Sequence, residues 1–155
     1  MTLDLEPIAG KEQLAILERL VSEDAAGMAE FGGFYGQASL RLAPLLGPDR
    51  RAWLVRCGGA VVGFIDGEND AGRVELSYFV TAAYRGRGIA QQAVARLVAA
   101  REWPDVAAYA ASVADGNAPS AGVARAAGFR EVGRNDYGES VWELRPRGDA
   151  DPTKT

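Results

Sequence analysis

The sequence predicts a mixed α/β (α+β) sheet fold in one domain that spans residues 1–146. Two features carry this prediction. Short segments in which apolar and polar residues alternate are separated by glycine-containing turns, which is typical of an antiparallel meander. A later strand runs through a glycine-rich loop into an amphipathic helix and another strand, an order that indicates two parallel neighbouring strands. We expect about six to seven strands and about four helices.

The N-terminal part is expected to form an edge strand and two helices. Leu3–Ile8 alternates like a strand, and Pro7 favours an edge position because proline cannot donate to a sheet ladder. Lys11–Met28 has leucines at helical spacing, and a short helix is expected over Gln37–Leu46. The segment between them carries three aromatic residues that either line a substrate pocket or pack in the core. These residues are Phe31, Phe34 and Tyr35.

A hairpin and a turn are expected next. Two strands, Arg51–Cys57 and Ala60–Asp66, flank Gly58-Gly59, a two-residue connection typical of a tight hairpin. We predict that Asp66–Gly72 is a polar turn that leads to the following strand. These strands would form the central antiparallel meander.

The following strand and loop have the features of a phosphate-binding site. Val74–Val80 alternates with period two, so Glu75 shares one face with Ser77. The loop after it leads directly into a helix N-terminus, where backbone N–H groups without intrahelical partners attract phosphate. Gly86 and Gly88 have no Cβ and therefore allow a phosphate close to the backbone.

The C-terminal part is expected to contain a strand, a helix and two final strands. Val106–Val113 would lie parallel to the preceding strand after a right-handed crossover. Asn117 or Asp115 can cap a helix over Ser120–Ala127, and Gly128 follows that helix as a typical C-terminal residue. The remaining expected segments are the strands Phe129–Gly133 and Ser140–Arg145 and a disordered tail over residues 147–155.

Composition excludes several classes of function. The 155 residues contain no histidine and one cysteine, Cys57, so an intramolecular disulfide, a Cys/His zinc site and a histidine-based triad are excluded, and no metal is expected. The formal net charge of −4 argues against a general nucleic-acid-binding protein. The N-terminus lacks the features of a signal peptide, and no apolar run has membrane-spanning length, so we expect a cytoplasmic protein without membrane contact.

Two motifs together resemble a known superfamily. Arg85-x-x-Gly88-x-Ala90 resembles the acyl-CoA pyrophosphate loop of the GNAT superfamily of N-acetyltransferases, and Asn117 followed by Gly128-Phe129 resembles its second motif. The strand Glu75-Leu-Ser-Tyr-Phe-Val80 is most similar to the branch that contains the ribosomal-protein N-terminal acetyltransferases. The resemblance covers about residues 51–145 and implies a GNAT-like acyl-CoA N-acyltransferase fold.

The resemblance implies that acetyl-CoA, as co-substrate, binds in a V-shaped opening between the fourth and fifth strands. Backbone N–H groups near Phe79 and Val80 would polarise the thioester carbonyl, and Asn117 would hydrogen-bond the pantetheine arm. Arginine side chains of the loop would add charge-assisted contacts to the pyrophosphate. The loop residues implied in pyrophosphate binding are Arg85, Gly86, Arg87, Gly88, Ile89 and Ala90.

The implied chemistry needs a base and an acid. Glu75 is the expected base, acting directly or through water, although it could instead pair with an arginine or face solvent. Many family members place a tyrosine four residues before the Gly-Phe glycine, and this chain has Ala124 there. Ser120 or Tyr137 could supply the proton in its place.

The expected function is therefore transfer of an acetyl group from acetyl-CoA to a primary amine by direct attack in a ternary complex. The acceptor would be a protein N-terminus, a small-molecule amine or an aminoglycoside-like compound, and the acidic residues between Asp66 and Asp70 favour a cationic one. The alternative is a non-catalytic acyl-CoA-binding sensor, because Ala124 replaces the usual tyrosine. The resemblance also allows a homodimer.

Overall fold

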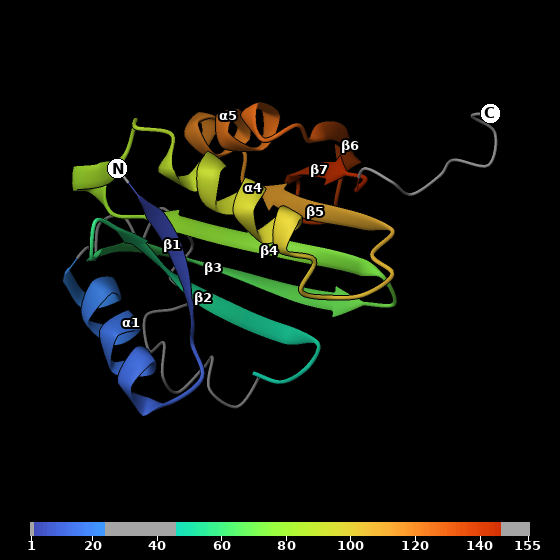
Figure 1. The fold of residues 1–155 in the computed structure, drawn as a ribbon. Coiled ribbons are helices and arrows are strands. Elements are labelled where there is room, and N and C mark those ends of the chain that lie inside the picture. Colours follow the sequence, from blue (N-terminus) through green and yellow to red (C-terminus); the bar gives the residue numbers. More distant parts are fainter. Residues whose placement is uncertain (1, 24–45, 147–155) are drawn as a thin grey trace.

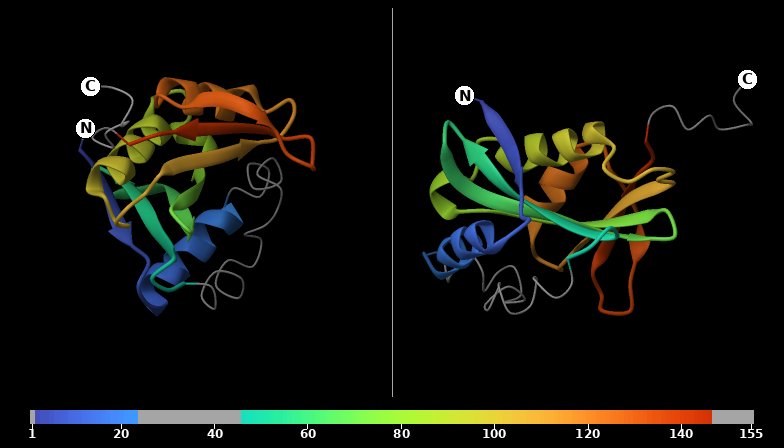
Figure 2. Two further views of the ribbon diagram at one scale, coloured as in Figure 1. Left: turned by 90° about the vertical axis from the view of Figure 1, so that its right-hand side faces the viewer. Right: turned by 60° about the horizontal axis from the view of Figure 1, so that its bottom comes forward.

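The computed structural model describes residues 2–23 and 46–146, in which one seven-stranded sheet has the order β1-β2-β3-β4-β5-β7-β6. Helix α1 covers one face of the sheet, and α4 and α5 cover the other (Figures 1 and 2). The strands are β1 Leu3–Pro7, β2 Arg50–Cys57, β3 Ala60–Asp70, β4 Arg73–Val80, β5 Ala108–Val113, β6 Arg130–Arg134 and β7 Ser140–Leu144. The helices are α1 Lys11–Glu23, the 3₁₀ helix η2 Ala82–Tyr84, α4 Ile89–Ala100 and α5 Ala118–Ala126.

The expected mixed sheet is confirmed. Strands β1 to β4 form an antiparallel meander, β1 lies at one edge, and β4 and β5 are the parallel pair. The predicted helix Lys11–Met28 is present over Lys11–Glu23. Residues 24–45 and 147–155 lie outside the described residues. The predictions for the Gln37–Leu46 helix, the three aromatic residues and the disordered tail therefore fall almost entirely outside them.

The predicted polar turn over Asp66–Gly72 is wrong. Strand β3 continues to Asp70, and the connection to β4 is only Ala71–Gly72, with φ angles of 50° and 91°. The polar residues of this stretch pair in register with β4, for example Glu68 with Glu75. Polar side chains can lie on the more open part of a sheet face without interrupting the backbone hydrogen bonds between strands. The run of polar residues after Asp66 was therefore wrongly interpreted as the end of the strand.

Two apolar clusters, one on each face of the sheet, hold the helices. Leu17, Leu20 and Val21 of α1 pack with Phe64 and other residues of the central strands. The other cluster contains the buried face of α4 and extends to the residues after that helix. The helices are therefore fixed by burial of apolar area rather than by helix propensity alone.

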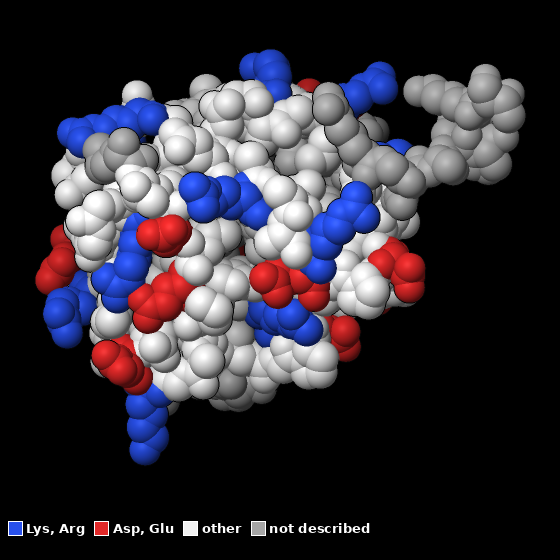
Figure 3. Space-filling view, viewed as in Figure 1, with Lys and Arg blue, Asp and Glu red and all other residues white. Residues whose placement is uncertain are grey.

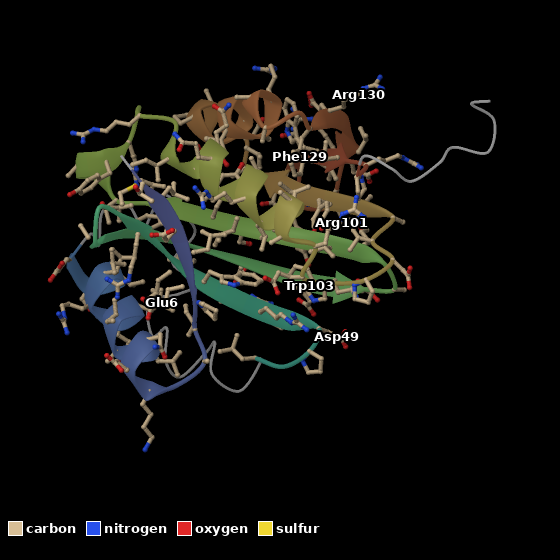
Figure 4. The ribbon with its side chains drawn as sticks, viewed as in Figure 1. Glu6, Asp49, Arg101, Trp103, Phe129 and Arg130 are labelled. Carbon is tan, nitrogen blue, oxygen red and sulfur yellow. The ribbon has the colours of Figure 1, made fainter. Side chains whose placement is uncertain are left out.

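Trp103 fixes the crossover between α4 and β5. It is buried, its ring lies edge-on to Trp53 at 5.8 Å, and its Nε1 donates a hydrogen bond to the Pro48 carbonyl (Figure 4). A Cβ at Gly67 would lie 2.6 Å from the Trp103 ring, so this strand position requires glycine. The predicted start of the fifth strand at Val106 is two residues early. Because Ala107 N–H bonds the Gly72 carbonyl, regular pairing begins only at Ala108.

The surface has mixed charge. On the face that Figure 3 shows, acidic and basic side chains are interspersed rather than gathered by sign. Among the helices of the described residues, none combines the length and apolarity needed to cross a membrane.

Candidate active site

The site begins where β4 and β5 separate. The two strands pair only at three positions, from Arg73 with Ala108 to Glu75 with Ala110. Beyond this point β5 continues beside β7, whereas β4 runs on to Val80 beside β3 (Figure 1). The two parallel strands thus form a V-shaped opening, as the resemblance implied.

The backbone of β4 points an N–H group into this opening. The Phe79 carbonyl faces β3, because its oxygen lies only 2.1 Å from where a Cβ of Gly63 would be. Neighbouring residues of a strand direct their backbone groups to opposite sides, so the Val80 N–H faces the opening. Of the two residues expected near the thioester, Val80 therefore has the suitable orientation, and the Phe79 side chain packs among the apolar residues beneath α1.

We predict that Gly63→Ala destabilises the protein by about 2–4 kcal/mol, because the new methyl group would overlap the Phe79 carbonyl and force β3 and β4 apart. Urea unfolding would measure the change in the free energy of unfolding. Gly122→Ala is the control, since nothing lies within 4 Å of its Cβ position in α5. The control should be unchanged or stabilised by about 0.5–1 kcal/mol, and equal stability of the two variants would contradict the close approach.

The loop after β4 ends in a helix N-terminus. Gly88 is the N-cap of α4 with φ 74°, and Gly86 also has a positive φ of 77°. The first turn of α4 contains no acidic side chain, and the Gln92 N–H is bonded to the Gly88 carbonyl. The preceding N–H groups, including those of Ile89 and Ala90, precede the first intrahelical bonds and point toward the loop. This end of α4 can bind an anion.

The two loop arginines have different positions. Arg85 Nε donates a hydrogen bond to the Val80 carbonyl at 2.9 Å, and its guanidinium lies 5.5 Å from the centre of the Phe79 ring. Arg85 therefore ties the loop to the end of β4. Arg87 lies on the exposed side of the loop, 5.3 Å from the centre of the Tyr84 ring. Both guanidinium groups belong to the loop that leads into the α4 N-terminus and give this loop positive charge.

The first turn of α5 faces the same opening. Asn117 is the helix N-cap, as expected, and its side chain accepts a hydrogen bond from Ser120 N–H at 3.2 Å. Ser120 Oγ donates to the hydroxyl of Tyr78 on β4 at 3.2 Å. Ala124 lies one turn further along α5 and is buried. The opening is thus bridged by polar contacts between β4 and α5.

On the α1 face of the sheet, three strands place polar residues in two rows. The register aligns Arg50 with Glu68 and Glu68 with Glu75, and it aligns Asp66 with Ser77 in the next row. These residues line a cavity of about 490 Å³ that also reaches α5 and the β6–β7 hairpin. From α5 and that hairpin come Asn117, Ser120, Asn135, Tyr137 and Glu139.

Glu75 is an exposed residue that lines this cavity. Its carboxylate accepts a hydrogen bond from Ser112 Oγ of β5 at 3.3 Å. The nearby guanidinium of Arg50 is bonded to Asp66 at 3.0 Å and Glu68 at 2.9 Å. Glu75 and Ser120 line one cavity, whereas the loop before α4 lies at the far end of β4.

Comparison of the sequence with models of protein families identifies the family of this chain. Residues 16–129 match the model of the acetyltransferase (GNAT) family. The chain belongs to the GNAT acetyltransferase family. The resemblance stated from the two motifs is confirmed, and so are the expected class of enzyme, an acetyl-CoA-dependent N-acetyltransferase, and its co-substrate. No curated protein matches the sequence.

Solved structures of other acetyltransferases share the GNAT fold. An acetyltransferase from Thermus thermophilus has a TM-score of 0.75 and 23% identity, over 94% of this chain and 97% of its own. The aminoglycoside acetyltransferase AAC(6′)-Ib, in complex with paromomycin and acetyl-CoA, has a TM-score of 0.79 and 16% identity, over 100% and 99% of the two chains. The ribosomal L7/L12 alpha-N-protein acetyltransferase RimL, in complex with coenzyme A, has a TM-score of 0.74 and 17% identity, over 94% of each. These likenesses show the fold.

Sequence reasoning placed Asp66 in an acidic turn of this GNAT protein and missed that it is a buried strand residue that lines the cavity. The side chain is 2% exposed, and burial raises the pKa of its carboxyl to about 7. The charge of Glu68 acts in the same direction, whereas hydrogen bonds from Ser77 lower this pKa. The signal was the period-two spacing of Phe64, Asp66 and Glu68, which continues the strand through the supposed turn.

Proposed function

We propose that this GNAT protein moves the acetyl group of acetyl-CoA to a primary amine by direct attack in a ternary complex. The observation that carries the proposal is the opening between β4 and β5, with the N-terminus of α4 beyond the Val80 end of β4 and the acidic cavity at the Glu75 end. One side suits a pyrophosphate and the other suits an amine. The two substrates would meet at Val80.

On the coenzyme side, the pyrophosphate is proposed to lie on the α4 N-terminus. The backbone N–H groups of Arg87, Gly88, Ile89 and Ala90 would bind it, and the side chains of Arg85 and Arg87 would add charge. Gly86 keeps this surface open because its Cβ position has no heavy atom within 4 Å. The pantetheine arm would run beside β4 and contact Asn117.

The chemical step needs a neutral amine and a polarised thioester. The Val80 N–H would bind the thioester oxygen, which becomes negatively charged in the tetrahedral intermediate. An alkylamine resembles lysine, whose pKa is about 10.4, so it enters as an ammonium ion and must lose a proton. Glu75 would take that proton, directly or through a water molecule. Its side chain lines the cavity, and its backbone is the last β4 position that pairs with β5 before the two strands separate. Ser120 is proposed on the side of the leaving sulfur.

On the acceptor side, we propose a cationic amine. The cavity is lined by four carboxylates and one guanidinium, so it is negative even when Asp66 is protonated. Glu68 and Glu75 stand directly opposite each other on adjacent strands, an arrangement that repels unless a cation lies nearby. Arg50 neutralises the Glu68 end, and an ammonium group would neutralise the Glu75 end. Aminoglycosides, polyamines and protein N-termini all meet this requirement.

The test is acetyl-CoA-dependent thiol release with a panel of N-terminal peptides, polyamines, aminoglycosides and amino acids, combined with calorimetric binding of acetyl-CoA to the same sample. We expect release with at least one cationic class. Faster turnover of neutral or anionic amines would contradict the cationic acceptor. Tight acetyl-CoA binding without release for any amine would favour the sensor alternative, and absence of binding would contradict the coenzyme site.

A further inference from the structure

Tyr78 links β4 to α5 beside the opening between β4 and β5. Its hydroxyl donates a hydrogen bond to the Ser120 carbonyl at 2.9 Å and accepts one from Ser120 Oγ at 3.2 Å. The residue is partly buried and lines the cavity. The contact joins residues that are 42 positions apart in the sequence and come from the two walls of the opening. A phenol is therefore held at the opening in which the thioester is proposed to lie.

The direction of the strand places this phenol near the proposed position of the thioester C–S bond. Tyr78 and Val80 are two positions apart on β4, so their side chains share a face and lie about 7 Å apart along the strand. On the proposed path of the pantetheine arm, beside β4 and in contact with Asn117 at the start of α5, a thioester whose oxygen is bound by the Val80 N–H would have its sulfur on the α5 side of β4. The Tyr78 hydroxyl reaches toward α5 from the same strand.

Other proton donors of the cavity are less suited to this place. Tyr137 lies at the tip of the β6–β7 hairpin and is 88% exposed. Asp66 is paired with Arg50 on the α1 face of the sheet, opposite to the face that carries Tyr78 and α5. A serine hydroxyl alone is a much weaker acid than a phenol. The described residues of the cavity thus offer one partly buried phenol next to the opening.

We propose that Tyr78 is the general acid that protonates the departing thiolate, with Ser120 as the hydrogen-bond donor to its oxygen. The inference rests on the proposed function. The amine nitrogen bonds to the carbonyl carbon, the C–S bond breaks with its electron pair going to sulfur, and the proton of the Tyr78 hydroxyl passes to that sulfur. The tyrosinate oxygen keeps the hydrogen bond from Ser120 Oγ. The nitrogen loses two protons: the ammonium gives the first to Glu75, which passes it to solvent, and the tetrahedral intermediate gives the second to solvent as the amide forms. Solvent returns one proton to Tyr78, so the net product besides the amide and CoA thiol is one proton.

The environment keeps the acid in its protonated form. Burial raises the pKa of the Tyr78 hydroxyl above its ordinary value, and the hydrogen bond from Ser120 lowers it again in part. The phenol therefore carries its proton at neutral pH, and the Ser120 hydroxyl can donate a hydrogen bond to the tyrosinate that forms when the proton is transferred.

The decisive experiment varies the leaving group. Tyr78→Phe keeps the ring and removes the hydroxyl, and Ser120→Ala keeps the phenol and removes its donor. For each variant, kcat/KM is measured with acetyl-CoA and with S-(4-nitrophenyl) thioacetate, whose aryl thiolate is a weaker base and leaves without a proton. We expect Tyr78→Phe to lose about 100-fold with acetyl-CoA and less than about fivefold with the aryl thioester. Ser120→Ala should lose about tenfold with acetyl-CoA alone.

An equal loss of kcat/KM with acetyl-CoA and with the aryl thioester would overturn the acid role of Tyr78 and leave it a structural role. Calorimetric acetyl-CoA binding and thermal unfolding of both variants show whether the opening is intact, and unchanged values are expected. If the wild-type protein releases no thiol with any amine, the proposed function fails and the acid role fails with it. An active wild type with an unaffected Tyr78→Phe variant overturns the inference alone.

Discussion

Replacing Gly88 with glutamate is expected to weaken acetyl-CoA binding by at least about 100-fold, because the new carboxylate would stand where the pyrophosphate is proposed to lie. Like charges brought together at a binding surface cost several kcal/mol, and each step of about 1.4 kcal/mol is a factor of ten in affinity. Gly88 is the N-cap of α4, so the carboxylate would also occupy the helix end that is proposed to bind the anion. Isothermal calorimetry with acetyl-CoA measures the loss.

Two further variants separate charge from backbone strain. Gly88 has φ 74°, which costs any other residue about 1–2 kcal/mol, so Gly88→Ala reports the strain alone. Its Cβ would meet only Gln92, at 3.8 Å, so no steric clash is added. Gly88→Arg has the same backbone strain as Gly88→Glu and a large side chain of positive rather than negative charge. It should therefore bind acetyl-CoA more tightly than Gly88→Glu. Equal affinities for the glutamate and arginine variants would show that no phosphate lies at this helix end.

The parts of this protein that were predictable from sequence are those set by local chemistry. The loop at Gly86 and Gly88 was predicted because glycine has no Cβ and leaves the backbone accessible, and in the structure both residues also have a positive φ. The Asn117 cap was visible because a capping side chain acts within its own helix turn. Strand alternation predicted the seven strands of the described residues, with ends that differ by a few positions.

The parts that were not predictable depend on contacts between distant segments. The separation of β4 from β5 after three paired positions involves segments far apart in the sequence, and it was expected only through the resemblance to the GNAT superfamily. The burial of Asp66 depends on the register of β2, β3 and β4, which alternation within one strand does not fix. The Tyr78–Ser120 contact joins a strand to a helix beyond the next strand. No local pattern reports such a contact.

Glu75→Gln is expected to lower kcat by about 100-fold or more while the affinity for acetyl-CoA stays unchanged. A positioned base contributes about 10²–10⁴ to the rate, and glutamine cannot accept the amine proton. The amide has nearly the same shape and can still accept the hydrogen bond from Ser112, so the opening should keep its geometry. The residue lies at the mouth of the acceptor cavity, away from the α4 N-terminus, which is why coenzyme binding should not respond.

The matched comparison for this variant is Glu68→Gln. Glu68 stands opposite Glu75 in the sheet and lines the same cavity, so both variants remove one negative charge from one place. Loss of charge alone should raise KM for a cationic acceptor in both, whereas loss of the base should lower kcat only in Glu75→Gln. Steady-state kinetics over a range of pH distinguishes them further, because without the base the rate should rise with pH as more of the free amine is already neutral. If the two variants show the same fall in kcat, Glu75 acts through charge and another group takes the proton.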